Sequence, residues 1–268
     1  MAPVDNALYD RLGKGWWDEN APLHSLRLMV NPARVPYFRA VLENGLRRDP
    51  ANLAVLEVGS GGGLLAEEFA RMGCEVTGVD PSAGSVDAAR THAHGAGLDI
   101  RYVVARGEEL PFPDASFDLV LCCDVLEHVD DVERVLAEAA RVLRPGGAYL
   151  YDTLNRTLLS RLLVIGVIQE WRLTRFMDRG LHDWHMFIRP RELREALRRH
   201  GLGGGGQAGM RPAARPPALL LTMWRHAHGQ ISQADLSRRL VMRRSRLRAV
   251  SYMGWAVRRS NANPGAAE

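Results

Sequence analysis

The stretch Val55-Leu-Glu-Val-Gly-Ser-Gly-Gly-Gly-Leu-Leu-Ala-Glu-Glu-Phe69 joins an apolar run to an amphipathic run through a cluster of glycines. Residues 53–58 have the length and composition of a buried strand, and the apolar residues from Leu64 to Met72 recur at helical spacing. Glycines between a strand and a helix let backbone N–H groups approach a ligand closely at the helix N-terminus. The stretch therefore predicts a strand, a ligand-binding turn and a helix.

Two acids narrow the kind of ligand that this turn can bind. Glu57 stands at the tip of the strand, in the spacing Glu57-x-Gly59-x-Gly61-x-Gly63, where a carboxylate repels pyrophosphate but accepts hydrogen bonds from a cationic amino acid. Asp80 ends the next predicted strand about twenty residues after the glycines, where a carboxylate can bind both hydroxyls of a ribose. The two acids favour S-adenosylmethionine (SAM) over a dinucleotide.

Strand and helix patterns alternate along the middle of the chain. Strands are predicted at 53–58, 75–80, 100–105, 117–122 and 148–153, and helices at about 34–47, 62–72, 82–96 and 131–143. This alternation predicts an α/β fold, a doubly wound and mostly parallel Rossmann-like sheet with helices on both faces. Because such sheets bind ligands at the carboxyl ends of their strands, we expect the motifs that follow the strands to meet at one edge.

The segments outside this core are less regular. We predict an apolar helix at 158–176, a helix at 190–200, a basic helix at 232–247 and a last strand at 250–257, with no regular structure at 203–206 and 211–217. The expected organisation is an N-terminal cap with the first helix (1–50), a SAM-binding core (51–153), acceptor and membrane-facing elements with the last strand (154–259), and a disordered tail (260–268).

Charge is distributed unevenly along the chain. The net charge is +4, but residues 211–259 hold eleven arginines and one acid, so the rest of the chain carries a net −6. This basic segment and the apolar helix at 158–176 have two interpretations that are equally supported. Either both contact an anionic membrane surface, or the basic segment is a solvated helix face and the apolar helix is an ordinary buried helix. Nucleic acid is not an expected partner, because the segment contains no recognition module.

Cysteine usage and hydropathy bear on the cellular compartment. Three cysteines, two of them adjacent in an apolar strand pattern, form no disulfide framework and indicate a reducing cytosol. The sequence begins without a secretory signal pattern, and no apolar run reaches the roughly 18–20 residues that span a bilayer. We therefore expect a cytoplasmic protein that can bind peripherally to the inner face of the membrane.

Five motifs occur in order along the predicted core: Glu57–Gly63, Val76–Asp80, Leu110-Pro-Phe-Pro-Asp-Ala-Ser-Phe-Asp118, Leu126-Glu-His-Val129 and Leu143-Arg-Pro-Gly-Gly147. Over residues 50–153 this set resembles a class I SAM-dependent methyltransferase. The flanking Trp16-Trp17-Asp18, Asn31-Pro32, His182-Asp183 and Phe187-Ile-Arg-Pro190 are similar to the ubiquinone-biosynthesis O-methyltransferase family. That family (2-polyprenyl-6-hydroxyphenol methylase and 3-demethylubiquinol 3-O-methyltransferase) methylates prenylated catechol and phenol rings and associates with membranes.

The resemblance implies an O-methyltransferase that transfers a methyl group from SAM to a hydroxyl of a lipophilic, prenylated phenol or catechol. The alternative is a SAM-dependent C- or N-methyltransferase acting on a soluble small metabolite. The SAM-binding residues that the resemblance and the strand ends predict are Glu57, Gly59, Gly61, Gly63, Asp80, Gly107 and Cys123.

The predicted catalytic residues are Asp124, Glu127 and His128, which follow the fourth strand in the pattern D-x-x-E-H and share one side if the chain turns helically. His128 can act as a general base with a pKa near neutrality. Alternatively, the three side chains hold Mg²⁺, which would bind a catecholate and lower the hydroxyl pKa. A purely structural alternative is that Glu127 and His128 cap the next helix.

Aromatic and histidine residues in the flanks leave further roles open. Trp16 and Trp17 are interpreted either as core or sheet-covering residues or as a lid on the cofactor. His182 and His185 are interpreted either as residues of the acceptor pocket or as hydrogen-bonding residues of a loop.

Overall fold

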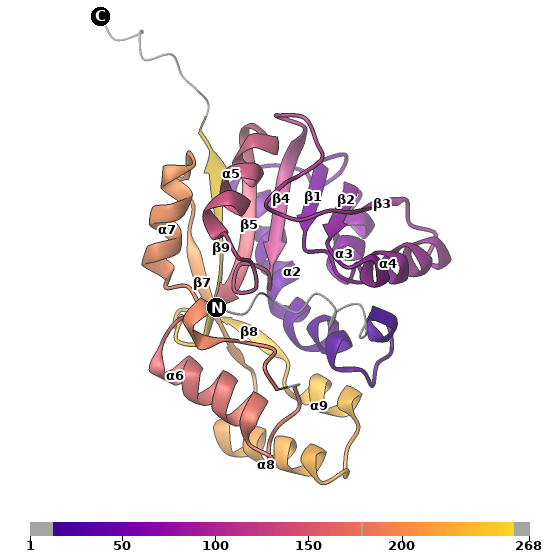
Figure 1. Cartoon of the computed structure of the whole chain (residues 1–268), viewed down its shortest axis with the longest axis vertical. Coiled ribbons are helices and arrows are strands. Elements are labelled where there is room, and N and C mark those ends of the chain that lie inside the picture. Colours follow the sequence, from indigo (N-terminus) through magenta and orange to yellow (C-terminus); the bar gives the residue numbers. More distant parts are fainter. Residues whose placement is uncertain (1–12, 178, 260–268) are drawn as a thin grey trace, which may run out of the picture.

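The computed structural model describes residues 13–177 and 179–259, so the predicted tail at 260–268 lies outside the described residues. Five parallel strands form the first part of the sheet (Figure 1): β1 (Ala54–Val58), β2 (Glu75–Asp80), β3 (Ile100–Val104), β4 (Phe117–Cys123) and β5 (Leu143–Leu154). Their order in the sheet is β3-β2-β1-β4-β5. The order reverses between β1 and β4, which is where an open α/β sheet binds its ligand.

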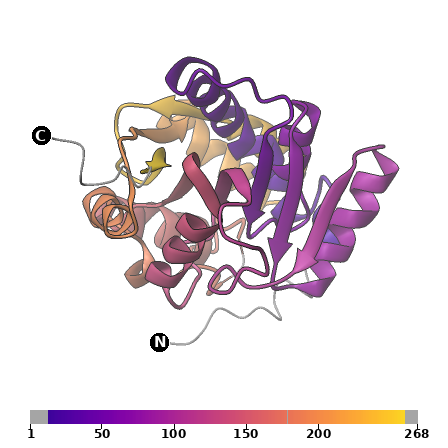
Figure 2. The same ribbon diagram turned by 90° about the horizontal axis from the view of Figure 1, so that it is seen from above.

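Helices cover both faces of these strands. On one face pack α2 (Asn31–Ala40), α3 (Ala66–Arg71) and α4 (Ala83–Gly95), and on the other pack α5 (Val132–Val142) and α7 (Pro190–Arg199). Neighbouring residues of β1 point to opposite faces, so Val55 packs in the first core and Leu56 in the second. In the view from above, the strands lie between these two groups of helices (Figure 2).

The sheet continues beyond β5 with antiparallel strands. The predicted last strand is confirmed as β9 (Ser251–Arg258), which pairs with β5, β7 (Gln207–Pro212) and the short β6 (Leu202–Gly203). β8 (Met242–Ser245) pairs with the outer side of β7. The α/β, doubly wound, mostly parallel Rossmann-like class is therefore confirmed, and part of the 154–259 region completes the same sheet.

Two expectations for the basic segment are wrong. Residues 211–217 are irregular only at 213–215, because 211 and 212 end β7 and Pro216 begins α8 (Pro216–Ala227). A proline is favourable in the first helical turn, where its missing N–H has no intrahelical partner to lose. The expected helix at 232–247 ends as α9 (Gln233–Arg239), and its C-terminal part is β8, because β7 offers a ladder that local sequence does not reveal.

Helix boundaries also differ from the sequence expectation. The glycine turn continues to Leu65, so α3 begins four residues later than expected. The apolar helix consists of α6 (Leu158–Ser160) and a wider π-helical segment η5 (Arg161–Glu170), and it ends at Trp171, whose backbone is extended. In the part of the chain that the structure describes, no helix combines the length and apolar composition that crossing a membrane requires.

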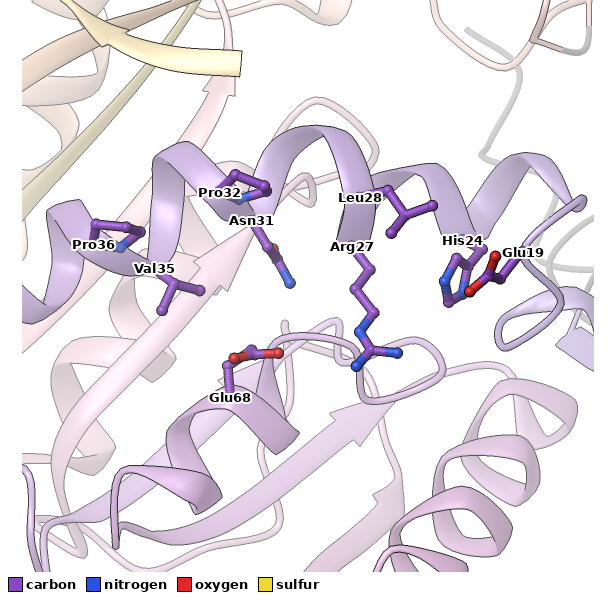
Figure 3. Close-up of a pocket in the computed structure, with 9 residues that line it drawn as sticks. All are labelled: Glu19, His24, Arg27, Leu28, Asn31, Pro32, Val35, Pro36 and Glu68. Carbon is purple, nitrogen blue, oxygen red and sulfur yellow. The ribbon is translucent and has the colours of Figure 1, made fainter. Parts of the chain in front are cut away.

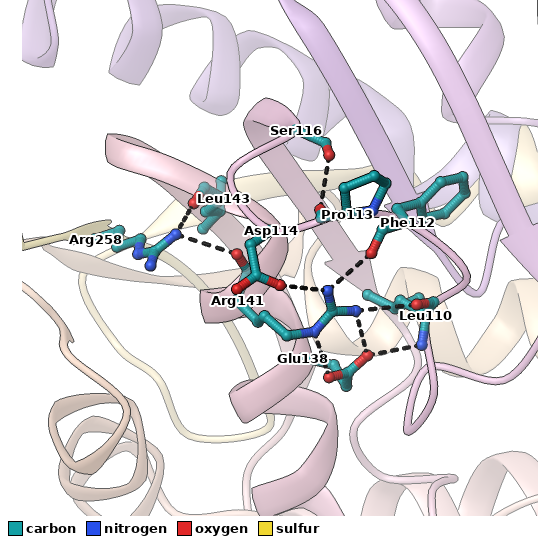
Figure 4. Close-up of polar contacts among 9 residues, drawn as sticks. All are labelled: Leu110, Phe112, Pro113, Asp114, Ser116, Glu138, Arg141, Leu143 and Arg258. Carbon is teal, nitrogen blue, oxygen red and sulfur yellow. Dashed lines mark hydrogen bonds and ion pairs between the residues drawn. The ribbon is translucent and has the colours of Figure 1, made fainter.

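Arg141 on α5 fixes the loop that leads into β4 (Figure 4). Its guanidinium donates to the carbonyl oxygens of Phe112 at 2.8 Å and Leu110 at 3.0 Å, and it pairs with Asp114 at 2.8 Å and Glu138 at 2.7 Å. The Pro-Phe-Pro-Asp motif is thus held by a helix rather than by a strand ladder.

Candidate functional site

Three glycines of the turn after β1 have backbone conformations that favour glycine. The φ angles of Gly59, Gly61 and Gly63 are +71°, +50° and +82°, in the left-handed region. A Cβ atom on Gly59 would lie 2.2 Å from Val125, and one on Gly63 would lie 2.3 Å from the Tyr102 hydroxyl. The turn therefore packs between Val125 in the loop after β4 and Tyr102 of β3, with no room for larger residues at these glycines.

Asp80 lies against this turn, as the sequence predicts. Its carboxylate accepts hydrogen bonds from the Gly61 N–H at 2.8 Å and from the Ser82 N–H at 2.9 Å. Parallel pairing of β1 with β2 places the ends of the two strands side by side. The carboxylate that is predicted to bind ribose is thus positioned at the glycine turn.

Glu57 is buried at the carboxyl end of β1, and one of its oxygens, Oε2, has no hydrogen-bond partner among the described residues. Burial raises the pKa of Glu57 to about 8, and the nearby Arg34 opposes this rise. A buried acceptor without a partner costs free energy until a donor reaches it. Its chemistry fits the cationic amino-acid end of SAM, and with Asp80 and the glycine turn the site fits this cofactor.

The two remaining predicted SAM-binding residues lie at neighbouring strand ends. A Cβ on Gly107 would lie 2.8 Å from Val58, so the loop after β3 packs on the end of β1. Cys123 is the last residue of β4, and burial raises the pKa of its thiol well above the ordinary range. Cys123 is therefore an uncharged residue at the carboxyl end of β4 at pH 7.

Trp16 and Trp17 contact the glycine turn itself. A Cβ added to Gly61 or Gly62 would lie 2.5 Å or 2.3 Å from the Trp16 side chain. The Trp16 indole N–H donates to Ser85 Oγ at 2.9 Å, and the Trp17 indole N–H donates to the Gly62 carbonyl at 2.8 Å. The tryptophans thus bind the turn to α4 and cover it.

Arg34 is a site residue that the sequence analysis does not identify. It is buried on α2, donates through Nε to Asp152 Oδ2 at 2.5 Å, and pairs through Nη2 with the Asp124 carboxylate. The Asp124 N–H in turn donates to Asp152 Oδ1 at 3.0 Å. The available signal was an arginine among the apolar residues of a predicted helix, since a buried guanidinium requires acidic partners.

Asp124, Glu127 and His128 lie in a turn between β4 and α5, and Asp124 has a φ of +54°. Glu127 is buried and accepts a hydrogen bond from Thr153 Oγ1 at 2.7 Å. Burial, followed by repulsion from Asp124, raises the pKa of Glu127 to about 8. Burial lowers the pKa of His128 to about 4, with Asp124 opposing the change, so the expected pKa near neutrality is wrong and the imidazole is neutral at pH 7.

The arrangement of these three residues does not fit the Mg²⁺ hypothesis. No group of three or more His, Cys, Asp or Glu side chains within residues 13–177 and 179–259 has a geometry that could hold a metal ion. Asp124 is paired with Arg34, and Glu127 is bonded to Thr153. The helix-capping alternative is also wrong, because Asp131 caps α5 by accepting from the Arg134 N–H at 3.0 Å.

The fold places one of the two flanking histidines at this turn. The His182 ring centre lies 5.1 Å from that of His128, although 54 positions separate them. His185 is exposed, and its carbonyl accepts a hydrogen bond from Arg156 at 3.3 Å. Of these two histidines, only His182 has a ring contact with the predicted catalytic turn.

A cavity of about 500 Å³ lies elsewhere, between the N-terminal helical segment and the start of α3 (Figure 3). Its lining residues are Glu19, His24, Arg27, Leu28, Asn31, Pro32, Val35, Pro36 and Glu68. None of the predicted SAM-binding or catalytic residues lines it.

Comparisons with known proteins agree with the fold and identify the family. Residues 56–151 match a family model described as a methyltransferase domain. The ubiquinone biosynthesis O-methyltransferase of Methylocella silvestris is 38% identical over 219 residues, which make up 78% of this chain and 84% of that protein. The corresponding protein of Azorhizobium caulinodans is 39% identical over 217 residues, or 78% and 83% of the two chains.

Among solved structures, a SAM-dependent methyltransferase of Thermotoga maritima, a possible histamine N-methyltransferase, has the same fold. Its TM-score is 0.54 at 19% identity, with 88% of this chain and 99% of that chain covered. Fold, cofactor-site chemistry and the extent of the sequence identity lead to one conclusion. The chain belongs to the ubiquinone biosynthesis O-methyltransferase family and is a SAM-dependent methyltransferase.

Proposed function

We propose that this protein transfers a methyl group from SAM to a hydroxyl of a lipophilic, prenylated phenol or catechol, in a reaction of the quinone-biosynthesis type. The observation that carries the proposal is the match to ubiquinone biosynthesis O-methyltransferases over more than four fifths of their length. The match covers 78% of this chain, and the family model alone covers residues 56–151, so the similarity extends well beyond the methyltransferase core.

The site supplies the groups that such a transfer requires. Bound SAM supplies a methyl group on a positively charged sulfur. Glu57 would bind the amino-acid end of this cofactor and Asp80 its ribose, and the glycine turn lets the backbone approach it. Holding donor and acceptor in line accounts for much of the catalysis in such a displacement.

His128 is the group that we assign to the acceptor proton. Its imidazole is neutral at pH 7 and would accept the hydroxyl proton as the oxygen bonds to the methyl carbon, whose bond to the sulfur would break with the electron pair passing to that sulfur. The carboxylate of Asp124 favours the imidazolium that forms, because it raises the pKa of His128. Arg34 holds Asp124 in place for this role.

A lipophilic acceptor also requires a route from the membrane, and the proposal includes peripheral attachment to an anionic bilayer. Large apolar side chains are exposed on α6, η5, the turn after it and α8: Leu158, Leu159, Leu162, Trp171, Leu173, Leu220, Leu221 and Trp224. Most of the arginines of the basic 211–259 segment, which contains α8, are also exposed. Apolar side chains with arginines favour the interface of anionic lipids.

The test is a methyl-transfer assay with labelled SAM over matched prenylated and non-prenylated phenols and catechols. We expect incorporation into the hydroxyl, with higher kcat/KM for the prenylated member of each pair. Absence of incorporation into every phenol would refute the proposal, and transfer to amines or carbon acids would favour the C- or N-methyltransferase alternative. Sedimentation with vesicles of anionic or of zwitterionic lipid tests attachment separately, with Leu158→Ser/Leu162→Ser as the variant and Val104→Ser, an exposed apolar residue of β3, as the control.

A further inference from the structure

His182 is held rigidly beside the catalytic turn by a residue of the apolar helix. Gln169 is 2% exposed, and its side-chain oxygen accepts a hydrogen bond from the His182 N–H at 2.8 Å. The amide nitrogen of the same side chain donates to the His182 carbonyl at 3.3 Å. These two bonds hold the N–H and the carbonyl of His182, and neither of them involves its imidazole.

The His182 imidazole meets the catalytic turn on one side and an apolar wall on the other. Its ring centre is 5.1 Å from His128, and the ring stands edge-on to the buried Phe187 at 6.1 Å. Its Nδ1 atom is buried without a hydrogen-bond partner among the described residues. A buried polar atom of this kind requires an explanation, and an absent ligand group supplies one.

We propose that His182 is a second acceptor-binding residue, which hydrogen-bonds the hydroxyl adjacent to the one that His128 deprotonates. The inference rests on the proposed function and adds to it the recognition of a vicinal pair of hydroxyls. A hydrogen bond spans about 2.8 Å, so two imidazoles whose centres are 5.1 Å apart can each reach one oxygen of such a pair. A hydroxyl both donates and accepts, and it therefore satisfies either tautomer of the His182 ring.

Burial favours this role over a purely electrostatic one. Desolvation and the nearby His128 lower the pKa of His182 to about 3, so this imidazole is also neutral at pH 7. A neutral ring selects its partner by hydrogen-bond geometry and not by charge. Sites built to bind a hydroxyl discriminate strongly against analogues that lack it, because their buried polar group is then left unpaired.

The test compares a catechol-type acceptor with its single-hydroxyl analogue, both carrying the same side chain, in wild type, His182→Ala and His182→Asn. In His182→Ala we expect kcat/KM for the catechol to fall about tenfold, the ratio for one lost hydrogen bond. The value for the monophenol should stay unchanged. The His182→Asn variant keeps a polar atom near the Nδ1 position and should restore part of the difference between the two acceptors.

Matched controls separate this role from a structural one. His185→Ala alters an exposed histidine of the same loop and should change neither acceptor's kcat/KM. SAM affinity, measured by calorimetry, should be equal in all variants because His182 does not contact the cofactor-site residues described above. An equal loss for both acceptors, or full catechol activity in His182→Ala, would overturn the inference. Absence of transfer to any phenol by the wild type would instead refute the proposed function itself.

Discussion

Arg34 on α2 donates through Nε to Asp152 on β5 at 2.5 Å, and both side chains are buried. The same guanidinium pairs with Asp124 beyond β4, so one cation ties a helix to the ends of two strands. Burial raises the pKa of Asp152 to about 7 even though Arg34 opposes the rise. The proposed methyl-transfer site is therefore assembled around a buried guanidinium that depends on its two carboxylate partners.

Replacing Arg34 should unfold the protein more readily than replacing other arginines of its helix. Arg34→Ala leaves two carboxylates without their cation, and we expect the free energy of unfolding to fall by about 3–5 kcal/mol. Arg39→Ala on the same helix removes only an exposed pair with Glu43 and should cost about 1 kcal/mol or less. Urea unfolding measures both, and equal losses in the two variants would contradict the role assigned to Arg34.

Glu127 should make stability fall as the pH rises. Its pKa is about 8 in the folded protein against an ordinary 4.5, so between these values the folded state holds a proton that the unfolded chain has released. The contribution of Glu127 to the free energy of unfolding is fully present below pH 4.5 and is lost as the pH rises through about 8. Urea unfolding at pH 5, 6.5 and 8.5 should therefore give a shallower decline for Glu127→Gln than for wild type, and parallel declines would rule out this pKa.

Gly62 should tolerate no side chain while Trp16 covers the turn. Alanine at this position brings its Cβ within 2.3 Å of the Trp16 side chain, and we expect overpacking to cost about 1–3 kcal/mol. SAM affinity should also fall, because the displaced indole no longer covers the turn. Gly95→Ala is the control, since a Cβ there meets nothing within 4 Å. Calorimetry with SAM and thermal unfolding of both variants check the result, and a stable Gly62→Ala with wild-type affinity would disprove the contact.

Arg141 should contribute to stability through the loop that it holds. Arg141→Ala leaves the Phe112 carbonyl without its donor and the Leu110 carbonyl with only the Phe112 N–H, and we expect a loss of about 2 kcal/mol. Arg141→Lys keeps the charge but cannot reproduce the forked geometry, so its loss should be intermediate. Hydrogen exchange of residues 110–116 provides a local measurement, and unchanged protection there would exclude the bracing role.

The sequence by itself determined where the predicted SAM-binding residues lie. The bounds of β2 follow from the residues, the bounds of β1 to within one residue, and Glu57, Asp80 and the glycines meet at one edge as expected. This succeeds because a strand, a glycine turn and a helix are local patterns, and parallel pairing carries each strand end to the same edge. Where this part of the structure differs from the prediction, as in the late start of α3, the difference is a longer glycine turn.

Tertiary structure decided the partners in the acceptor half. One alternative had Asp124, Glu127 and His128 bind a metal, but the fold brings Arg34 to Asp124 and Thr153 to Glu127. It likewise brings His182 to His128, and it converts residues 242–245 into a strand. Which side chains neutralise a buried charge, and which segment completes a ladder, depend on groups far away in the chain. Local periodicity contains no information on such pairs, because their free energy arises only when packing removes water from both partners.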